Sequence, residues 1–353
     1  MPKIDELDKN LKVSTSISKE DILFFDVRQE PFSVHGLLYE NGQFRRVPKT
    51  VADSVSKGVS YLSQNCAGGR VRFQTDSSYV AIAAKMTQVD KMPHFALTGS
   101  SGFDMYVDEG SGIRYYGTFV PPMDMTDGYA SVLEFQDRKM REITIHFPLY
   151  SGVDELHVGL QEDAVVQAAV PYRNKKPYVY YGHSITQGGC ATRPGNAYPS
   201  ILSRRFHIDH INLGFSGNGK GEPEITEYIA GLDMECFVMD YDANAPDPEH
   251  LRNTHEKMFR AIRKAHPKIP VIFMSTTVMP RFQKYLRDER RDIVYQTYQN
   301  AKAAGDSNVY FWDGGKEFAP YEEYGTVEGC HPNDYGFCGI AKSLGDLIEQ
   351  IMG

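Results

Sequence analysis

The stretch Tyr-Val-Tyr-Tyr-Gly-His-Ser-Ile-Thr at residues 178–186 decides the fold of the second half of the chain. Its first four residues are apolar or aromatic β-formers, and they predict a buried strand that ends at Gly182. Ser184 follows closely, so its hydroxyl is expected at the carboxyl end of a strand, where open α/β sheets bind ligands. The alternative is a serine in a turn or at a helix cap. Thr186 replaces the second glycine of the α/β-hydrolase elbow, so that motif is not present.

Strands alternate with helices from residue 178 to the last residues of the chain. A polar, proline-bounded joint at residues 171–177 precedes this pattern. The expected elements are strand 178–181, helix 197–206, strand 208–213, helix 222–230, strand 236–241, helix 248–265, strand 271–275, helix 288–303, strand 309–312 and helix 336–351. Repeated strand–helix units predict a parallel, doubly wound sheet with helices on both faces.

The first half of the chain is expected to be all-β. Asn41-Gly42 lies between two apolar runs and is a strong hairpin signal. The expected strands, including the two that flank this turn, are 21–27, 34–39, 44–47, 71–75, 79–84, 103–107, 114–119, 130–135, 143–147 and 155–160. Many short strands separated by turns predict a β-sandwich or jelly roll. We therefore expect two domains, residues 1–174 and residues 175–353.

Polar blocks follow the strands of the second half, and together they suit acyl-transfer chemistry. The blocks lie at residues 182–186, 212–219, 240–246 and 327–334. Each follows a strand of one parallel sheet, so all four can converge on its carboxyl edge. Ser184 would attack an acyl carbonyl, and His331 would take its proton. Glu328, three residues before His331, is the candidate carboxylate that orients the imidazole. The backbone N–H groups of Ser184 and Gly217, with the Asn244 amide, are the candidate oxyanion donors.

These blocks resemble those of the SGNH hydrolases, the GDSL esterase superfamily, over most of residues 177–353. The pattern of that family is a serine after the first strand, a glycine in the second block, an asparagine in the third, and a closing Asp-x-x-His-Pro. The resemblance implies that Ser184 is the nucleophile and His331 the base. It implies that Gly217 and Asn244 donate to the oxyanion. The implied fold is a flavodoxin-like, three-layer α/β/α hydrolase domain, and no cofactor or metal is expected.

Glu328 is the main departure from the family pattern, which has aspartate at that position. Glutamate is one methylene longer, so it needs a different rotamer or backbone to reach the imidazole. The alternative partners of His331 are a main-chain carbonyl and Asp313, although Asp313 also suits a turn. His183 is expected to be a loop histidine outside the triad, and Asp334 is expected to cap the last helix.

The stretch Gly-Phe-Asp-Met-Tyr at residues 102–106 is similar to the Gly-x-Asp-Leu-Tyr signature of a β-sandwich domain that precedes some SGNH esterases. Such two-domain members are similar to carbohydrate esterases. The resemblance implies a serine esterase that hydrolyses a small acyl ester, an acetyl group on a carbohydrate, through an acyl-enzyme. Its substrate is then a small-molecule or oligosaccharide ester. The alternatives are an acyltransferase, a lipase or thioesterase with the same triad, and an inactive carbohydrate-binding protein.

Composition excludes several other classes of protein. The 353 residues carry a formal net charge of -8, which argues against a nucleic-acid partner. No apolar run approaches the roughly 20 residues that span a bilayer. The charged first ten residues contain no apolar signal segment, so the sequence as it stands predicts a cytoplasmic protein; a signal already removed would make it secreted or periplasmic.

The five cysteines are scattered and have no Cys-x-x-Cys spacing, which predicts reduced thiols rather than a disulfide framework. The histidines likewise show no metal-ligand spacing. If Ser184 and His331 meet in space, Cys190 and Cys330 are expected to come near each other as well.

Overall fold

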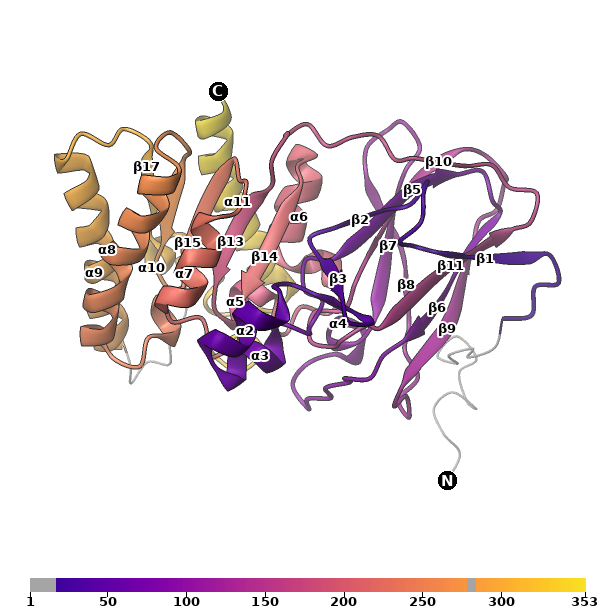
Figure 1. The fold of residues 1–353 in the computed structure, drawn as a ribbon, viewed down its shortest axis with the longest axis horizontal. Helices are drawn as coiled ribbons and strands as arrows, with labels where there is room; N and C mark the ends of the chain where they lie inside the picture. Colours follow the sequence, from indigo (N-terminus) through magenta and orange to yellow (C-terminus); the bar gives the residue numbers. More distant parts are fainter. Residues whose placement is uncertain (1–16, 278–283) are drawn as a thin grey trace.

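The computed structural model describes residues 17–277 and 284–353, and its chain forms a β-rich part followed by an α/β part (Figure 1). The chain passes from one part to the other between β12 (Val166–Gln167) and β13 (Tyr178–Gly182). Within the described ranges, no helix combines the length and the apolar character needed to cross a bilayer.

Two antiparallel sheets enclose one apolar core in the β-rich part, so the predicted β-sandwich is confirmed. The first sheet has the order β1 (Ile22–Asp26), β11 (Glu155–Gln161), β6 (Tyr79–Lys85) and β9 (Gly128–Glu134). The second has the order β12, β5 (Arg70–Thr75), β10 (Arg141–His146), β7 (Phe103–Asp108) and β8 (Arg114–Phe119), with β2 (Ser33–His35) also paired to β5. Alternate residues of both sheets, such as Val71 and Phe73 on β5 and Val80 and Ile82 on β6, are buried in the shared core.

The predicted hairpin is present as β3 (Leu38–Glu40) and β4 (Gln43–Arg45). Asn41 and Gly42 both have positive φ angles, 53° and 84°. A two-residue turn with both φ angles positive matches the twist of the flanking strands, which is why Asn-Gly marks such turns.

The expectation of an all-β first half is wrong at three short helices: α2 (Lys49–Val55), α3 (Lys57–Leu62) and α4 (Leu97–Ser100). Ser56 caps α3 by accepting a hydrogen bond from the Val59 N–H at 3.1 Å. Ala52, Val59 and Leu62 are buried in a core cluster that belongs mainly to the α/β part. Burial against a distant segment stabilises these helices, because their own length of one or two turns would not.

Five parallel strands form the sheet of the α/β part, in the order β14 (His210–Gly214), β13, β15 (Cys236–Asp240), β16 (Val271–Met274) and β17 (Val309–Trp312). The second strand along the chain therefore lies outside the first, and the later strands extend in the other direction. This is the flavodoxin-like order, so the predicted fold class is confirmed.

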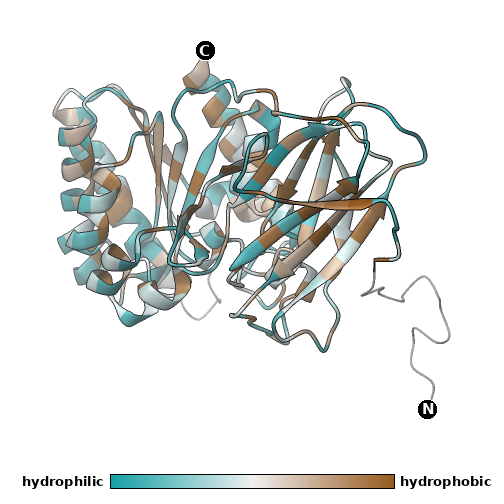
Figure 2. Ribbon diagram, turned by 45° about the vertical axis from the view of Figure 1, so that its right-hand side comes forward, coloured by the Kyte–Doolittle hydropathy of each residue, from teal (hydrophilic) through white to brown (hydrophobic). Residues whose placement is uncertain are grey.

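Helices cover both faces of this sheet. Residues of α6 (Tyr198–Phe206) and α11 (Asp334–Met352) pack in the core on one face, and residues of α7 (Pro223–Ala230), α8 (Pro248–Ala265) and α9 (Lys284–Ala303) in the core on the other. The shorter helices are α5 (Ser184–Gln187), α10 (Gly314–Phe318) and the 3₁₀ turns Pro194–Asn196, Asp242–Asn244 and Ala319–Tyr321. Hydrophilic residues lie along the outer helices, and hydrophobic and hydrophilic residues both occur along the strands between them (Figure 2).

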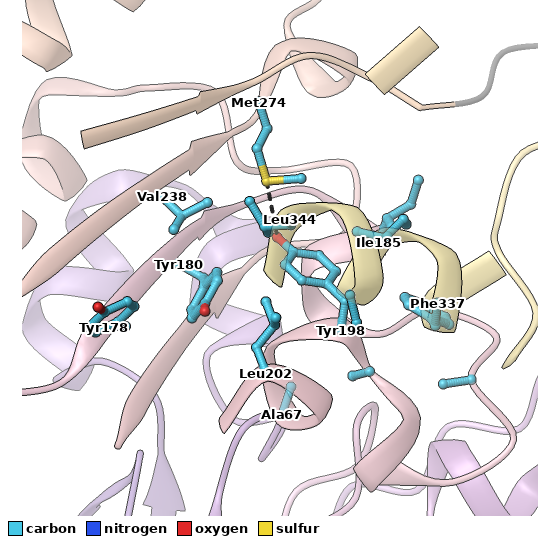
Figure 3. Close-up of a cluster of buried hydrophobic side chains, with 14 of the residues drawn as sticks. Ala67, Tyr178, Tyr180, Ile185, Tyr198, Leu202, Val238, Met274, Phe337 and Leu344 are labelled. Carbon is cyan, nitrogen blue, oxygen red and sulfur yellow. Dashed lines mark hydrogen bonds between the residues drawn. The ribbon is translucent and has the colours of Figure 1, made fainter. Parts of the chain in front are cut away.

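The central strand β13 is buried along its whole length, as its sequence predicted. Tyr178 and Tyr180 lie in the core on one face of the sheet, and Val179 and Tyr181 lie in the core on the other. Figure 3 shows Tyr178 and Tyr180 in the first of these clusters, where the Tyr198 hydroxyl oxygen lies 4.0 Å from the sulfur of Met274. Because β13 is packed on both faces, the position of residues 183–187, which follow it, is well fixed.

The Asp104 carboxylate ties the β-rich part to the α/β part. Asp104 is fully buried; its Oδ1 accepts a hydrogen bond from His146 Nδ1 at 2.9 Å, and its Oδ2 accepts one from the Gly195 N–H at 2.9 Å. Burial holds the pKa of His146 below its ordinary value, so the imidazole donates as a neutral ring. The guanidinium of Arg204 lies 3.8 Å from the centre of the Tyr106 ring. The Asp and Tyr of the motif at residues 102–106 therefore both contact the α/β part.

We expect the substitution Asp104→Ala to lower the free energy of unfolding by about 2–6 kcal/mol. It leaves two buried donors, on His146 and Gly195, without an acceptor, and each such group costs about 1–3 kcal/mol. Chemical denaturation followed by circular dichroism measures the change. Asp124 is exposed, and Asp124→Ala is the control, expected to stay within about 0.5 kcal/mol of the parent. Equal stability of the two variants would contradict this role of Asp104.

Candidate active site

Ser184 begins α5 directly after the central strand β13. The cap of this one-turn helix is His183, whose Nδ1 accepts a hydrogen bond from the Ile185 N–H at 3.2 Å, so the serine is not the cap. Gly188 ends the helix with a φ of 105°. β13 lies between β14 and β15, where the strand order reverses, and doubly wound sheets bind ligands at that crevice. The short helix itself was not predicted, because four residues carry no periodic pattern.

Ser184 and His331 come together although they are far apart in the sequence. The Ser184 Oγ lies 2.9 Å from His331 Nε2, and His331 Nδ1 lies 2.5 Å from Oε1 of Glu328. An ionised carboxylate only accepts hydrogen bonds, so the proton of the neutral ring is assigned to Nδ1. Nε2 then presents a lone pair to the serine hydroxyl. The arrangement can remove a proton from Ser184 and hold it on an oriented imidazole.

A tight loop lets Glu328 reach the imidazole despite its extra methylene. Oε1 of Glu328 also accepts a hydrogen bond from the His331 backbone N–H at 3.1 Å. The loop is closed by the Val327 N–H, which donates to the His331 carbonyl at 2.9 Å, and Gly329 within it has a φ of 84°. The other candidate acid, Asp313, instead accepts from Arg291 Nε at 2.8 Å and caps α10. The structure thus brings Glu328, and not Asp313, to His331.

The predicted oxyanion donors lie in loops that follow the two strands beside β13. Gly217 has a φ of 67°, and an added Cβ there would meet no other atom within 4 Å. Asn244 belongs to the 3₁₀ turn after β15, and its Nδ2 donates to the Phe215 carbonyl at 2.9 Å. That bond fixes the amide beside the Gly217 loop, and the second hydrogen of the amide is left for another acceptor. Ser184, as the first residue of α5, has an N–H with no partner inside the helix.

Buried polar groups beneath the Ser184 turn hold it in place. His183 is buried, and its Nε2 lies 3.3 Å from Oδ1 of Asp240. Burial alone would lower the pKa of His183, but the carboxylate of Asp240 outweighs it, and the pKa is raised. The other oxygen of Asp240 accepts from Thr186 Oγ1 at 2.8 Å and from the Tyr198 hydroxyl at 3.2 Å. His183 therefore fixes the turn that carries Ser184. As expected, it lies outside the series Ser184, His331 and Glu328.

Gln187 connects the β-rich part to the loop that carries Gly217. Its Nε2 donates to Asn65 Oδ1 at 3.0 Å and to the Leu149 carbonyl at 3.1 Å, and its Oε1 accepts from the Ser216 N–H at 3.0 Å. Only the folded structure brings these four groups together, since they come from four separate segments. The β-rich part therefore helps to fix the position of an oxyanion loop.

A groove of about 350 Å³ lies beside these groups and is lined by both parts of the chain: Gly58, Tyr61, Leu62, Asp90, Lys91, Met92, Tyr150, Ser216 and Asn218. Tyr150 connects it to the serine, because its hydroxyl donates to the Ser184 carbonyl at 3.4 Å. Tyr61 is exposed, and its hydroxyl donates to the Asp90 carboxylate at 2.8 Å. An aromatic ring and several polar groups thus line a groove next to Ser184.

Asp334 does not cap the last helix as expected. Asn333 is the cap of α11, and its side chain accepts from the Gly336 N–H at 3.1 Å. Asp334 is the first helical residue, and its Oδ1 accepts from the Thr192 N–H at 2.9 Å. Because Asn333 caps the helix, the carboxylate of Asp334 is available to hydrogen-bond to Thr192, in the loop that follows Cys190.

Two family models match the chain. Residues 175–349 match the GDSL-like lipase/acylhydrolase family, and residues 22–166 match the model described as the N-terminus of the SGNH-hydrolase type of esterase. No curated protein sequence matches the chain.

Solved structures match over nearly the whole length of the chain. A protein from Bacteroides ovatus described as a GDSL-like lipase is 26% identical, with a TM-score of 0.85, covering 94% of this chain and 98% of its own. The salicylyl-acyltransferase SsfX3 of a tetracycline biosynthetic pathway is 18% identical, with a TM-score of 0.76 and the same coverage. An acetyl xylan esterase from Butyrivibrio proteoclasticus is 12% identical, with a TM-score of 0.58, covering 94% of this chain and 99% of its own. The last two show a shared fold.

Proposed function

Because the chain belongs, through residues 175–349, to the GDSL-like lipase/acylhydrolase family and is a carboxylic ester hydrolase, we propose that it removes small acyl groups, acetyl above all, from a carbohydrate through an acyl-enzyme on Ser184. The observation that carries the proposal is the hydrogen-bonded series Ser184, His331 and Glu328 at the carboxyl edge of the parallel sheet. A serine needs a base within hydrogen-bond reach, and the base needs a third group to orient it.

The proposed reaction has two halves. In the first, Ser184 Oγ attacks the acyl carbonyl as its proton passes to His331 Nε2, and the alcohol then leaves with that proton. In the second, water attacks the acyl-enzyme with His331 again as the base, which frees the acid and restores Ser184. The Glu328 carboxylate holds the ring by Nδ1 in both halves and stabilises the imidazolium that forms.

Oxyanion binding is assigned to the N–H groups of Ser184 and Gly217 and to the Asn244 amide. The attacked carbonyl oxygen gains negative charge that the ground state does not have, so donors fixed around it favour the transition state. The bond from Asn244 to the Phe215 carbonyl supports this assignment, since it fixes the amide before the substrate arrives.

We expect Asn244→Ala to lower kcat by about 10²–10³-fold, the usual cost of losing one oxyanion donor, with little change in KM. Initial rates with p-nitrophenyl acetate measure both. Asn308 is the matched control, because its amide also donates to a backbone carbonyl, that of Lys268, before β17 begins. Asn308→Ala should keep the parent kcat. An Asn244→Ala variant that is folded and fully active would assign this side chain to turn structure alone.

The lining of the groove beside Ser184 suggests that the leaving alcohol of the ester substrate is polar. Asp90, Lys91 and Asn218 offer hydrogen-bonding groups, and the exposed ring of Tyr61 offers a flat apolar surface. Sugars present hydroxyl groups at their edges and C–H groups on their faces, so this lining suits them better than it suits a long acyl chain.

A panel of esters tests the proposed specificity. We expect acetyl esters to be hydrolysed faster than butyryl or longer esters of the same p-nitrophenol, and we expect purified protein to release acetate from acetylated oligosaccharides. Ser184→Ala gives the background for every substrate. A preference for long acyl chains, or no release from any acetylated sugar, would overturn the carbohydrate assignment while leaving the esterase mechanism open to its own tests.

Acyl transfer to an alcohol is the second candidate, because the salicylyl-acyltransferase shares more of this fold than the acetyl xylan esterase does. The same acyl-enzyme serves both reactions, and the acceptor decides between them. Adding free sugars or glycerol to the assay distinguishes them: a transferase forms a new ester, whereas a hydrolase continues to release the acid.

A further inference from the structure

His94 and Cys190 join His331 in a cluster that the proposed ester hydrolysis does not use. A ring nitrogen of His94, Sγ of Cys190 and a ring nitrogen of His331 all lie within 4.8 Å of one another. The ring centroids of His94 and His331 are 6.2 Å apart. His94 is exposed, His331 is partly exposed and Cys190 is buried, so the cluster is open to solvent at His94.

We propose that His94, Cys190 and His331 form a binding site for zinc or a similar soft divalent cation, and that the bound ion inhibits the esterase. One thiolate and two imidazoles are ligands that zinc prefers, whereas magnesium and calcium prefer oxygen. Tetrahedral zinc at its usual bond lengths holds such ligands about 3.3–3.6 Å apart. The three donor atoms lie within 4.8 Å of one another, and the exposed side chain of His94 can supply the movement that brings them to this separation. Solvent or Ser184 would fill the fourth position.

Glu328 already prepares His331 to act as a metal ligand. A histidine that binds a metal usually donates its other ring N–H to a carboxylate, which fixes the tautomer and directs the free nitrogen at the ion. The bond between Nδ1 of His331 and Glu328 has this form and leaves the lone pair on Nε2. Nε2 is also the atom that takes the proton of Ser184. One lone pair cannot bind an ion and accept a proton at once, so occupancy and catalysis exclude each other.

The backbone holds the Cys190 thiol in place in a conformation that side chains rarely adopt. Cys190 has a φ of 72°, directly after Gly188 and Gly189. An added Cβ on Gly189 would lie 3.3 Å from Cδ2 of His331, so this turn runs against the imidazole. A cation that binds here displaces the proton of the Cys190 thiol, because the thiolate is the form of cysteine that binds a metal.

A second group of donors, Glu328, Cys330 and His331, surrounds the other side of the same ring. Glu328 is less free to bind an ion there, because one oxygen already accepts from both the ring and the backbone of His331. An ion bound there to Nδ1 of His331 would displace the hydrogen bond from that nitrogen to Glu328, whereas binding by His94 and Cys190 leaves it in place. The sequence could not predict the cluster of His94, Cys190 and His331, because the three residues come from distant segments of the chain.

Cobalt titration of the full chain tests the site without reference to activity. Co²⁺ takes the place of zinc and gives a thiolate-to-metal absorption band when a cysteine binds it. Reduced, chelator-treated protein is titrated with CoCl₂, and ZnCl₂ is then added. We expect a band that saturates at one ion per chain and is displaced by zinc. Cys190→Ala and His94→Ala should each weaken Co²⁺ binding by more than about 100-fold. That loss exceeds the roughly 10–100-fold expected when a residue that only hydrogen-bonds to a metal ligand is removed.

Controls separate this site from its neighbours. Cys338 is an exposed thiol on α11, and Cys338→Ala should keep the band. Cys190→Ser repeats the test if the alanine variant does not fold. A band that survives in Cys190→Ala, or one that disappears in Cys330→Ala, would overturn the proposal.

The inhibition arm rests on the proposed function, and the cobalt arm does not. ZnCl₂ should stop hydrolysis of p-nitrophenyl acetate, and EDTA should restore it. For each protein we measure the fraction of its zinc-free rate that remains when zinc is present. We expect that fraction to be at least about tenfold larger in His94→Ala than in the parent. An active enzyme without the cobalt band overturns the metal site alone. A protein with the band but no esterase activity overturns the proposed function alone.

Discussion

Replacing Ser184 by alanine is expected to lower kcat for p-nitrophenyl acetate by about 10⁶-fold, the scale of loss on removing a serine nucleophile. Without Oγ no acyl-enzyme forms, and His331 is left to orient water at best. The fold should persist, since within residues 17–277 and 284–353 the Ser184 side chain hydrogen-bonds to His331 alone. Initial rates, with thermal melting as the check on folding, measure the effect.

Ser54 provides the matched control for this substitution. It is an exposed serine on α2 whose hydroxyl donates to the Val51 carbonyl at 2.8 Å, and Ser54→Ala should keep the parent rate. A folded Ser184→Ala variant with more than about 1% of the parent kcat would remove Ser184 from the mechanism, because that loss falls far short of the cost of a missing nucleophile.

The second large effect is expected at Glu328. Glu328→Gln keeps the length of the side chain but replaces an acceptor-only carboxylate by an amide, which can turn its NH₂ toward His331 and select the wrong tautomer. We expect kcat to fall by about 10⁴-fold, the cost of the same change at a triad aspartate. The structure supports so large a fall in kcat, since Glu328 accepts hydrogen bonds from both the ring and the backbone of His331.

Glu323→Gln is the control for Glu328→Gln, because Glu323 is an exposed carboxylate in the segment before the same loop. It should leave kcat unchanged. If Glu328→Gln also leaves kcat unchanged, the Glu328 carboxylate does not orient His331 during catalysis.

The elements that sequence predicted well are those with local signals. The strand at 178–182 is marked by its own run of β-formers, and Asn41-Gly42 marks its hairpin by the two positive φ angles that it needs. Helices α2 and α3 were missed because they are short and depend on burial of Ala52 and Val59 against the α/β part. Such burial depends on partners far along the chain, which local patterning does not describe.

The same contrast holds for the site. Ser184, Glu328 and His331 could be named because each stands at a characteristic place relative to a strand or to another motif residue. Gln187 and Asp240 could not, because their contacts with Ser216 and His183 arise only when separate segments meet. Cys190 and Cys330 were expected to approach each other, and the thiol of each lies within 4.8 Å of a ring nitrogen of His331.

Covalent labelling by a fluorophosphonate tests the central claim most directly, because the probe reacts only with a serine that a base has activated. The protein is labelled and digested, and the modified residue is located by mass spectrometry, with heat-denatured protein as the control. We predict one adduct, on Ser184, that is absent from Ser184→Ala and from the denatured sample. An adduct on another serine, or no adduct on a folded and ester-hydrolysing protein, would contradict the account.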